Sequence, residues 1–224
     1  IGNLIITNNI MHLSGTNTTG VDLLNEGGLF IDHVNDSTIT LGTINISENV
    51  ILGGQYGIGF MGSFNDLSNV QVTTGDLLFN NNTLAGQSEA GIVCLPYSGL
   101  GWHGTTHGVF GKTLAQGNSI MIGNPNAIGI VMVYGSMYTS GFFNYTGTAH
   151  AQTGDMLVQN NSIMSNGGGI FLWMDSVGGN NETQGLYGHA IVSTGNFILN
   201  HNVIEADNYP GIILAVEIVT TIIH

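Results

Sequence analysis

The sequence predicts an all-β protein wound as a single-stranded parallel β-helix, a solenoid of about six coils with long loop insertions. One pattern returns six times: a glycine, a short apolar run, an asparagine seven residues after the glycine, and then a glycine–aliphatic pair. The copies recur about every 33–43 residues, a period typical of solenoids. Inside each copy the apolar residues lie two apart, which is the period of a β-strand.

Each copy is expected to begin with a short strand after its first glycine. In the second copy Ile44 and Ile46 lie five and three residues before Asn49, so both side chains face one side of the strand. The asparagine is expected to end the strand, because Asn tolerates the left-handed conformation and suits a tight bend. The six opening glycines are Gly2, Gly42, Gly75, Gly111, Gly154 and Gly195.

Two more short strands are expected in each copy. One opens two residues after the asparagine with an apolar residue, such as Ile51, and the other begins at the glycine–aliphatic pair. Three short strands joined by bends describe one coil. The glycines of the six pairs are Gly20, Gly57, Gly91, Gly129, Gly169 and Gly211.

Stacked coils would place the six asparagines above one another. Each side-chain amide could then hydrogen-bond the next and form an internal ladder, as in other stacked-strand structures. The predicted ladder consists of Asn9, Asn49, Asn82, Asn118, Asn161 and Asn202.

The segment that best represents the repeat is MLVQNNSIMSNGGGIFL, from Met156 to Leu172. In this segment, and over nearly its whole length, the chain resembles the right-handed parallel β-helix family with the pectate-lyase-like repeat. The resemblance implies a fold but no activity, because this architecture hosts many functions. A β-sandwich would also give many short strands, but it gives no reason for a fixed spacing from glycine to asparagine.

The composition excludes several classes of partner. The formal net charge is −13, and Lys112 is the only lysine or arginine in 224 residues. Nucleic acid is therefore excluded as a partner, because phosphate binding relies on Lys and Arg. Membrane insertion is not expected, since no apolar run reaches the length of a membrane span. No proline-rich or charged linker divides the chain, so residues 1–224 are expected to form a single domain.

The polar, uncharged composition indicates an extracellular or cell-surface location. The chain begins with Ile1 rather than Met, which fits the removal of a leader. Cys94, the single cysteine, is expected to be an inert buried thiol. Four sequons between the repeats are candidate N-glycosylation sites: Asn17, Asn35, Asn144 and Asn181.

The segments between the copies carry most of the aromatic residues. These rings could fold back over the coils as satellite clusters, contact a neighbouring subunit, or form a platform for stacking sugars. The residues of this interface or glycan platform are Trp102, Tyr134, Tyr138, Phe142, Phe143, Tyr145 and Tyr187.

No pattern in the chain predicts catalysis, so we expect no enzyme activity and no catalytic residues. Pectate lyases use a basic residue and calcium, yet this chain has no arginine, and Lys112 lies beside an opening glycine. A glycoside hydrolase needs two carboxylates at a set spacing, and no pair of acidic residues clusters in that way. His103 and His107 are expected to be exposed loop histidines, because the glycines beside them disfavour a chelating helix. No cofactor and no metal are expected.

These observations lead to a structural hypothesis. The tail 211–224 is the most apolar and β-branched segment, and it is expected either to cap its own coil end or to pair with a neighbouring molecule. We therefore expect a structural subunit of an extracellular filament or cell-surface layer that self-assembles through the β-helix ends or the terminal strand. The alternative is an extracellular adhesin or carbohydrate-binding module; a polysaccharide lyase or glycoside hydrolase fits less well.

Overall fold

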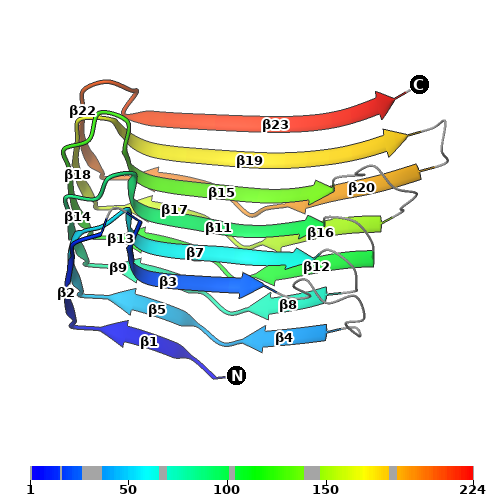
Figure 1. The fold of residues 1–224 in the computed structure, drawn as a ribbon, viewed down its shortest axis with the longest axis horizontal. Coiled ribbons are helices and arrows are strands. Elements are labelled where there is room, and N and C mark those ends of the chain that lie inside the picture. Colours follow the sequence, from blue (N-terminus) through cyan, green and yellow to red (C-terminus); the bar gives the residue numbers. More distant parts are fainter. Residues whose placement is uncertain are drawn as a thin grey trace.

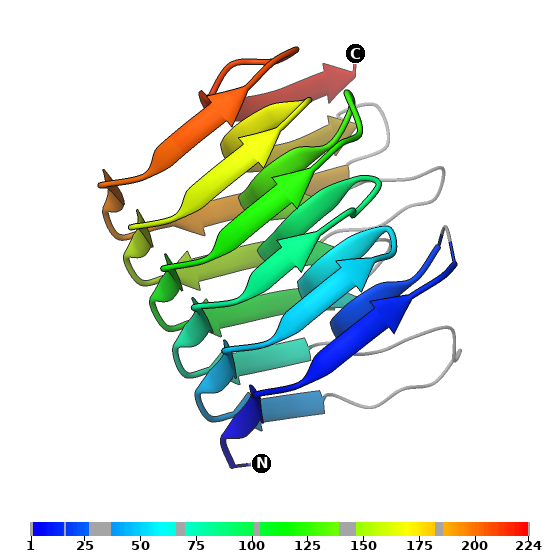
Figure 2. The ribbon, with the colours of Figure 1, turned by 90° about the vertical axis from the view of Figure 1, so that its left-hand side faces the viewer.

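The computed structural model is an all-β parallel solenoid, as the sequence predicts (Figure 1). It describes residues 2–15, 17–26, 37–65, 70–100, 104–138, 147–181 and 186–223, and none of these residues forms a helix. Strands of successive coils pair in parallel and in register. The two described ends of the chain lie at opposite ends of the stack (Figures 1 and 2).

Two narrow sheets hold the repeat itself. The first sheet contains β1 (Leu4–Thr7), β5 (Ile44–Ser47), β9 (Leu77–Asn80), β13 (Thr113–Gln116), β17 (Met156–Gln159) and β21 (Phe197–Asn200). The second sheet contains β2 (Ile10–Leu13), β6 (Val50–Gly53), β10 (Thr83–Ala85), β14 (Ser119–Ile122), β18 (Ser162–Ser165) and β22 (Val203–Ala206). Each sheet has six strands: four of them lie between two neighbours, and the two end strands pair on one side only.

Two wider groups of strands complete the coils. The long sheet contains β3 (Thr19–Glu26), β7 (Tyr56–Asn65), β11 (Ala90–Leu100), β15 (Ile128–Tyr138), β19 (Gly168–Asn181) and β23 (Ile212–Ile223). The return sheet contains β4 (Ser37–Leu41), β8 (Val70–Thr74), β12 (Gly104–Phe110), β16 (Gly147–Thr153) and β20 (Leu186–Ser193). The long sheet faces the viewer in Figure 1, and the return sheet lies behind it and leads into the first sheet.

The predicted long loop insertions are wrong for most of their described residues, because those residues form strands. Each complete coil therefore has four strands rather than three short ones, and the third strand is 8 to 14 residues long. In β12 the alternation is carried by glycine as well as by apolar residues: Gly108 and Phe110 are buried, while His107 and Val109 are half-buried. Because some inward positions hold small residues, the sequence here does not show the apolar alternation that is typical of a strand.

The bend between the first and second sheets forms one residue earlier than the sequence predicts. The residue before the ladder asparagine has a positive φ in every coil: 59° at Asn8, 58° at Glu48 and 51° at His201, for example. The ladder asparagine is then free to bond its side chain to the next coil. The bend and the ladder are therefore made by two adjacent residues.

The six asparagines form the expected ladder along the inside of this bend. In each step the Nδ2 of one asparagine donates to the Oδ1 of the next coil's asparagine at 2.9 to 3.1 Å. The backbone N–H of the same asparagine donates to that same Oδ1 at 3.0 or 3.1 Å. The four interior asparagines are at most 1% exposed, so each step satisfies polar groups that have no access to water.

Two columns of glycine let the coils approach closely. At the opening glycines, each backbone N–H donates to the preceding coil's glycine carbonyl at 3.2 or 3.3 Å. At the glycine–aliphatic pairs, a Cβ on Gly91 would lie 2.7 Å from the carbonyl oxygen of Gly129. A larger residue at any position of this second column except Gly211 would push two coils apart.

Part of the core is made of rows of branched aliphatic residues stacked along the axis. Ile51, Leu84, Ile120 and Ile163 form one row, and Ile58, Ile92, Ile130 and Ile170 form another. These eight side chains are at most 2% exposed. Burial of such side chains stabilises the fold by about 1.5–3 kcal/mol each.

We expect Asn118→Ala to lower the free energy of unfolding by several kcal/mol. The substitution removes Nδ2 bonds to the Phe79 carbonyl and to Asn161, and it leaves Asn82 without its acceptor. Each buried polar group left unsatisfied costs about 1–3 kcal/mol. Urea unfolding followed by circular dichroism measures the change.

Asn9→Ala is the matched control, because Asn9 lies at the end of the ladder and bonds only to Asn49 and to its own coil. We expect Asn9→Ala to lower the free energy of unfolding by clearly less than Asn118→Ala does. Equal costs for the two substitutions would show that the ladder adds nothing beyond local bonds.

Candidate functional site

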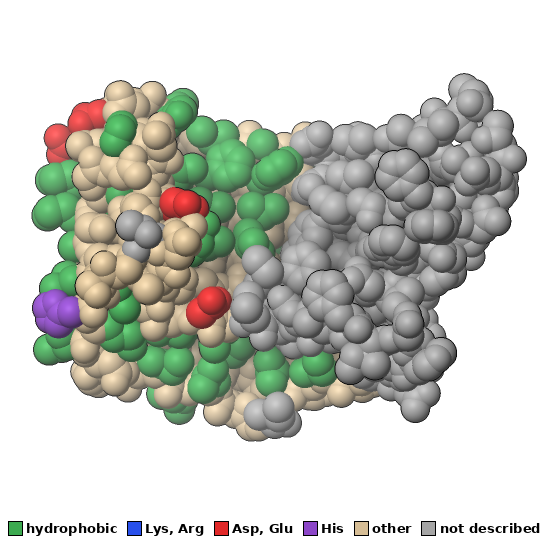
Figure 3. Space-filling view, in the orientation of Figure 1, with side chains coloured by type: hydrophobic (Ala, Val, Ile, Leu, Met, Phe, Trp, Pro, Cys, Tyr) green, Lys and Arg blue, Asp and Glu red, His purple; other side chains and the backbone are tan. Residues whose placement is uncertain are grey.

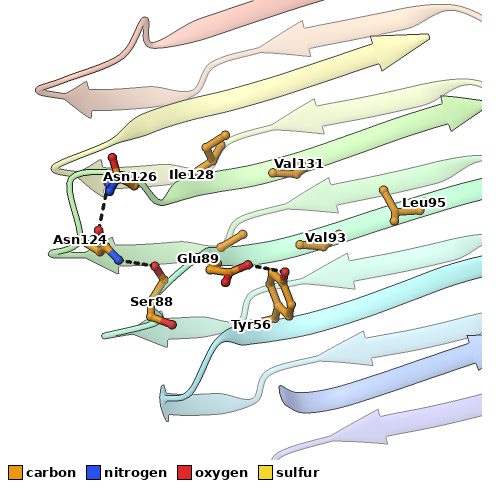
Figure 4. Close-up of a pocket in the computed structure, with 10 residues that line it drawn as sticks. Tyr56, Ser88, Glu89, Val93, Leu95, Asn124, Asn126, Ile128 and Val131 are labelled. Atoms are coloured by element: carbon orange, nitrogen blue, oxygen red, sulfur yellow. Dashed lines mark hydrogen bonds between the residues drawn. The ribbon is translucent and has the colours of Figure 1, made fainter. Parts of the chain in front are cut away.

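A groove on the outer face of the long sheet is a surface hollow lined by described residues (Figure 4). It has a volume of about 600 Å³. We call it the outer groove and define it by Tyr56, Ser88, Glu89, Val93, Leu95, Asn124, Asn126, Ile128 and Val131.

Strand alternation supplies the floor of the outer groove. In β11 the side chains of Ile92 and Cys94 are buried in the core, so Val93 and Leu95 face outward. Val131 is the outward neighbour of Val93 in β15. Hydrophobic side chains are visible on this face of the molecule in Figure 3, with acidic side chains among them.

The turns from the second sheet into the long sheet form the wall. The side chain of Asn124 donates to the carbonyl of Ser88 in the preceding coil at 2.5 Å, and the backbone N–H of Asn126 donates to the Oδ1 of Asn124 at 3.0 Å. Figure 4 shows these bonds along the edge of the groove. The wall is therefore fixed by contacts between neighbouring coils.

Glu89 is the acidic group of the outer groove. The Tyr56 hydroxyl donates to its Oε2 at 2.5 Å, and the Gln55 side chain donates to its Oε1 at 2.8 Å. These two hydrogen bonds, led by that from Tyr56, lower the pKa of the exposed Glu89 carboxyl. Partial burial, then the hydrogen bond to Glu89 and its charge, raise the pKa of Tyr56 to about 12.

Smaller hollows adjoin the outer groove on both sides along the stack. One shares Tyr56, Val93 and Leu95 with it and also contacts Asn17 and Asp22. The other shares Asn126 and Ile128 with it and is lined by aromatic side chains, Phe171 and Tyr209. A carboxylate acceptor, amide groups and an apolar floor suit an uncharged ligand that has hydroxyl groups and an apolar face.

The sequence did not point to Tyr56 or Glu89. A signal was present, because Gln55 and Glu89 both lie two residues before the glycine of a glycine–aliphatic pair. Aligning the repeats would have placed them on adjacent coils. Their hydrogen bond needs the structure, since it depends on how each turn leaves the second sheet.

The predicted aromatic platform is wrong for Tyr134, which is 1% exposed and points into the core. Alternation in β15 turns it inward together with Ile130 and Met132, and its ring meets Phe197 edge to face at 6.0 Å. The backbones of Tyr138 and Tyr187 lie in β15 and β20. The remaining platform residues, Trp102, Phe142, Phe143 and Tyr145, lie outside the described residues.

The candidate glycosylation sites fall in different settings. Asn17 is exposed in the turn before β3. The backbone of Asn181 ends β19 and pairs with Leu186 and Ile223, so this residue lies in a strand rather than between repeats. Asn35 and Asn144 lie outside the described residues.

The prediction for Cys94 is confirmed, and the prediction for His107 is wrong. Cys94 is a buried free thiol, as expected, and burial raises its pKa far above the ordinary range. His107 is not a loop residue: it lies in β12, half-buried, beside His150 of the next coil. His103 lies outside the described residues. No group of three or more His, Cys, Asp or Glu side chains able to hold a metal is found in the described part of the chain.

Comparisons with known proteins give no relative: no model of a protein family, no curated protein and no solved structure matches the chain. The resemblance to the pectate-lyase-like repeat therefore extends to the parallel solenoid architecture alone. In the described part of the chain there is also no helix that could span a membrane.

We expect Glu89→Gln to lower the pKa of Tyr56 from about 12 towards 10. The substitution removes the negative charge that opposes ionisation of the phenol, while the larger effect of burial remains, so the pKa should stay above 10. Tyrosine-specific ¹³C NMR during a pH titration resolves this one ring. An unchanged pKa would mean that Glu89 does not contact Tyr56 in solution.

Proposed function

We propose that the protein is a structural subunit of an extracellular filament or cell-surface layer, in which copies stack end to end along the solenoid axis. The observation that carries this proposal is that each coil offers one set of groups on its upper side and the complementary set on its lower side. A stack with this property has no built-in limit to its length, and a head-to-tail contact that does not close gives an open filament.

The asparagine ladder supplies the first complementary pair. Asn202 makes a side-chain bond back to the Val158 carbonyl, but its backbone N–H and second amide hydrogen have no acceptor among the described residues. At the other end, the Oδ1 of Asn9 has no donor there. A second copy stacked above Asn202 would continue the ladder through its own Asn9.

The opening glycines supply a second pair with the opposite polarity. Gly195 donates to the Gly154 carbonyl, which leaves the Gly195 carbonyl facing upward. Gly2 uses its carbonyl to accept from Gly42 and has no described partner for its N–H. The Gly2 N–H of a second copy would match the Gly195 carbonyl. Two ladders of opposite polarity fix the orientation of the copies as head to tail.

The exposed apolar surface also gathers at the two ends. Ile212, Leu214 and Val216 are 50%, 62% and 58% exposed, although they pair with the core residues Ile170 and Leu172 and the half-buried Met174 of β19. At the other end Leu4, which pairs with the core residue Ile44, is 38% exposed. Apolar end surfaces rimmed by hydrogen-bonding edges favour association.

Gly2→Val and Gly211→Val should block stacking without harming the fold. A Cβ on Gly2 would meet no atom within 4 Å, and one on Gly211 would only approach Ile204 at 3.4 Å. In the interior, a Cβ on the equivalent Gly42 or Gly169 would collide with the adjoining coil. We expect either change to raise the concentration at which copies assemble by about tenfold or more, since the loss of one or two hydrogen bonds costs about 1.4 kcal/mol.

Light scattering and negative-stain electron microscopy over a concentration series measure this effect. Gly123→Ala is the matched control, because a Cβ there also meets nothing but lies on a side turn. Thermal melting of the dilute variants shows that the coil itself is intact. A wild-type chain that stays monomeric at high concentration, or glycine variants that assemble like the control, would overturn the proposal.

A second candidate function is that of an adhesin or carbohydrate-binding module, favoured by the outer groove. Glu89 offers a fixed acceptor for sugar hydroxyls, and Val93 and Val131 offer an apolar floor. We expect Glu89→Gln together with Asn126→Ala to reduce binding on a glycan array by about tenfold, the cost of about one hydrogen bond to a charged group. Binding that survives both changes would place any glycan site elsewhere, and an array with no bound glycan would rule this function out.

A further inference from the structure

We propose that His107 and His150 form a binding site for a borderline transition-metal ion such as Ni²⁺, Cu²⁺ or Zn²⁺. The two residues lie directly opposite each other in β12 and β16, in adjacent coils of the return sheet. Their Nδ1 atoms are 2.9 Å apart, and the ring centroids are 4.6 Å apart with an interplanar angle of 63°. This inference does not depend on end-to-end stacking.

The two Nδ1 atoms face each other across adjacent strands, so one metal ion placed between them could bind both rings. Without a metal, one neutral ring must donate its Nδ1–H to the lone pair of the other, so the pair makes one hydrogen bond. A metal ion accepts both lone pairs at once. With metal–nitrogen distances of about 2.0–2.1 Å, a tetrahedral ion would hold the two nitrogens about 3.3 Å apart. The rings need to separate by only a few tenths of an ångström.

The strand neighbours of the pair are uncharged, and the pair is only partly covered. Both rings are half-buried, so one side of the pair remains open to water. The register places the uncharged Gln71 beside His107 on one side and Ile191, which is 50% exposed, beside His150 on the other. The net charge of the chain is −13, and its only lysine pairs with Asp76 at 3.5 Å, so the general field attracts cations.

Binding at this pair would connect two coils. A metal ion held by one histidine from each of two adjacent strands adds a link across the return sheet. It stabilises the folded chain whenever it binds the unfolded chain less well. The ligands must be unprotonated, so binding should weaken as the pH falls and the histidines take up protons.

Isothermal titration of the full chain with NiCl₂ and ZnCl₂ at pH 7.5 tests the site. We expect one ion to bind per chain, to raise the melting temperature, and to bind much more weakly at pH 5.5. His107→Ala and His150→Ala should each weaken binding at least about tenfold and abolish the metal-dependent rise in melting temperature. His12→Ala is the matched control, because His12 is an exposed strand histidine outside this pair.

The outcomes separate a metal site from a purely structural pair. If the rings only stack, both variants will melt at a lower temperature than the wild type, and metal will shift none of the three. That result, or metal binding that is equal in His107→Ala and His12→Ala, would overturn the proposal. Tautomer assignment by ¹⁵N NMR gives an independent readout, since metal bound at Nδ1 leaves the proton on Nε2 of both rings.

Discussion

The rest of the structure depends on the buried asparagine ladder. Its repeat must equal the spacing of parallel strands, about 4.8 Å, because each amide spans the gap between two coils. Aspartate in the same place would set carboxylates above one another, and alanine would leave buried donors and acceptors unpaired. Asparagine presents a carbonyl acceptor and an amide group with two donor hydrogens on one short side chain. The ladder therefore fixes both the distance between coils and their lateral alignment at the tightest bend.

The glycine columns act with the ladder because all three lie where coils meet most closely. Gly42 and Gly75 remove side chains beside the start of the first sheet, and Gly57 and Gly91 do so at the start of the long sheet. The Asn49 and Asn82 steps lie between these two columns along each coil. With three points of each coil aligned, the inward residues of successive coils fall into register and stack in rows.

The sequence predicted the features that repeat as residue types and missed those that repeat only as backbone structure. Six copies at matched offsets were enough to predict the solenoid and the ladder. The return sheet was missed because its inward positions hold small residues such as Gly108 and Ala151. The bend residue was misassigned because Asn8, Glu48 and His201 share no chemistry, only a backbone conformation. The inward orientation of Tyr134 and the Tyr56–Glu89 hydrogen bond depend on how each strand leaves its turn. The spacing of residues in the sequence does not determine this.

The difference between inward-facing and outward-facing residues also explains where a functional site can form. Inward rows and ladders tolerate little change, because each inward residue contacts the coil on each side of its own. Outward rows carry no such constraint, and it is there that unlike residues meet across coils: Tyr56 with Glu89, and Asn124 with Ser88. Each of these contacts joins residues that are more than 30 positions apart in sequence and lie on neighbouring coils. A binding surface on this scaffold is therefore built by pairs of neighbouring coils, and it forms only after the ladder has brought those coils into register.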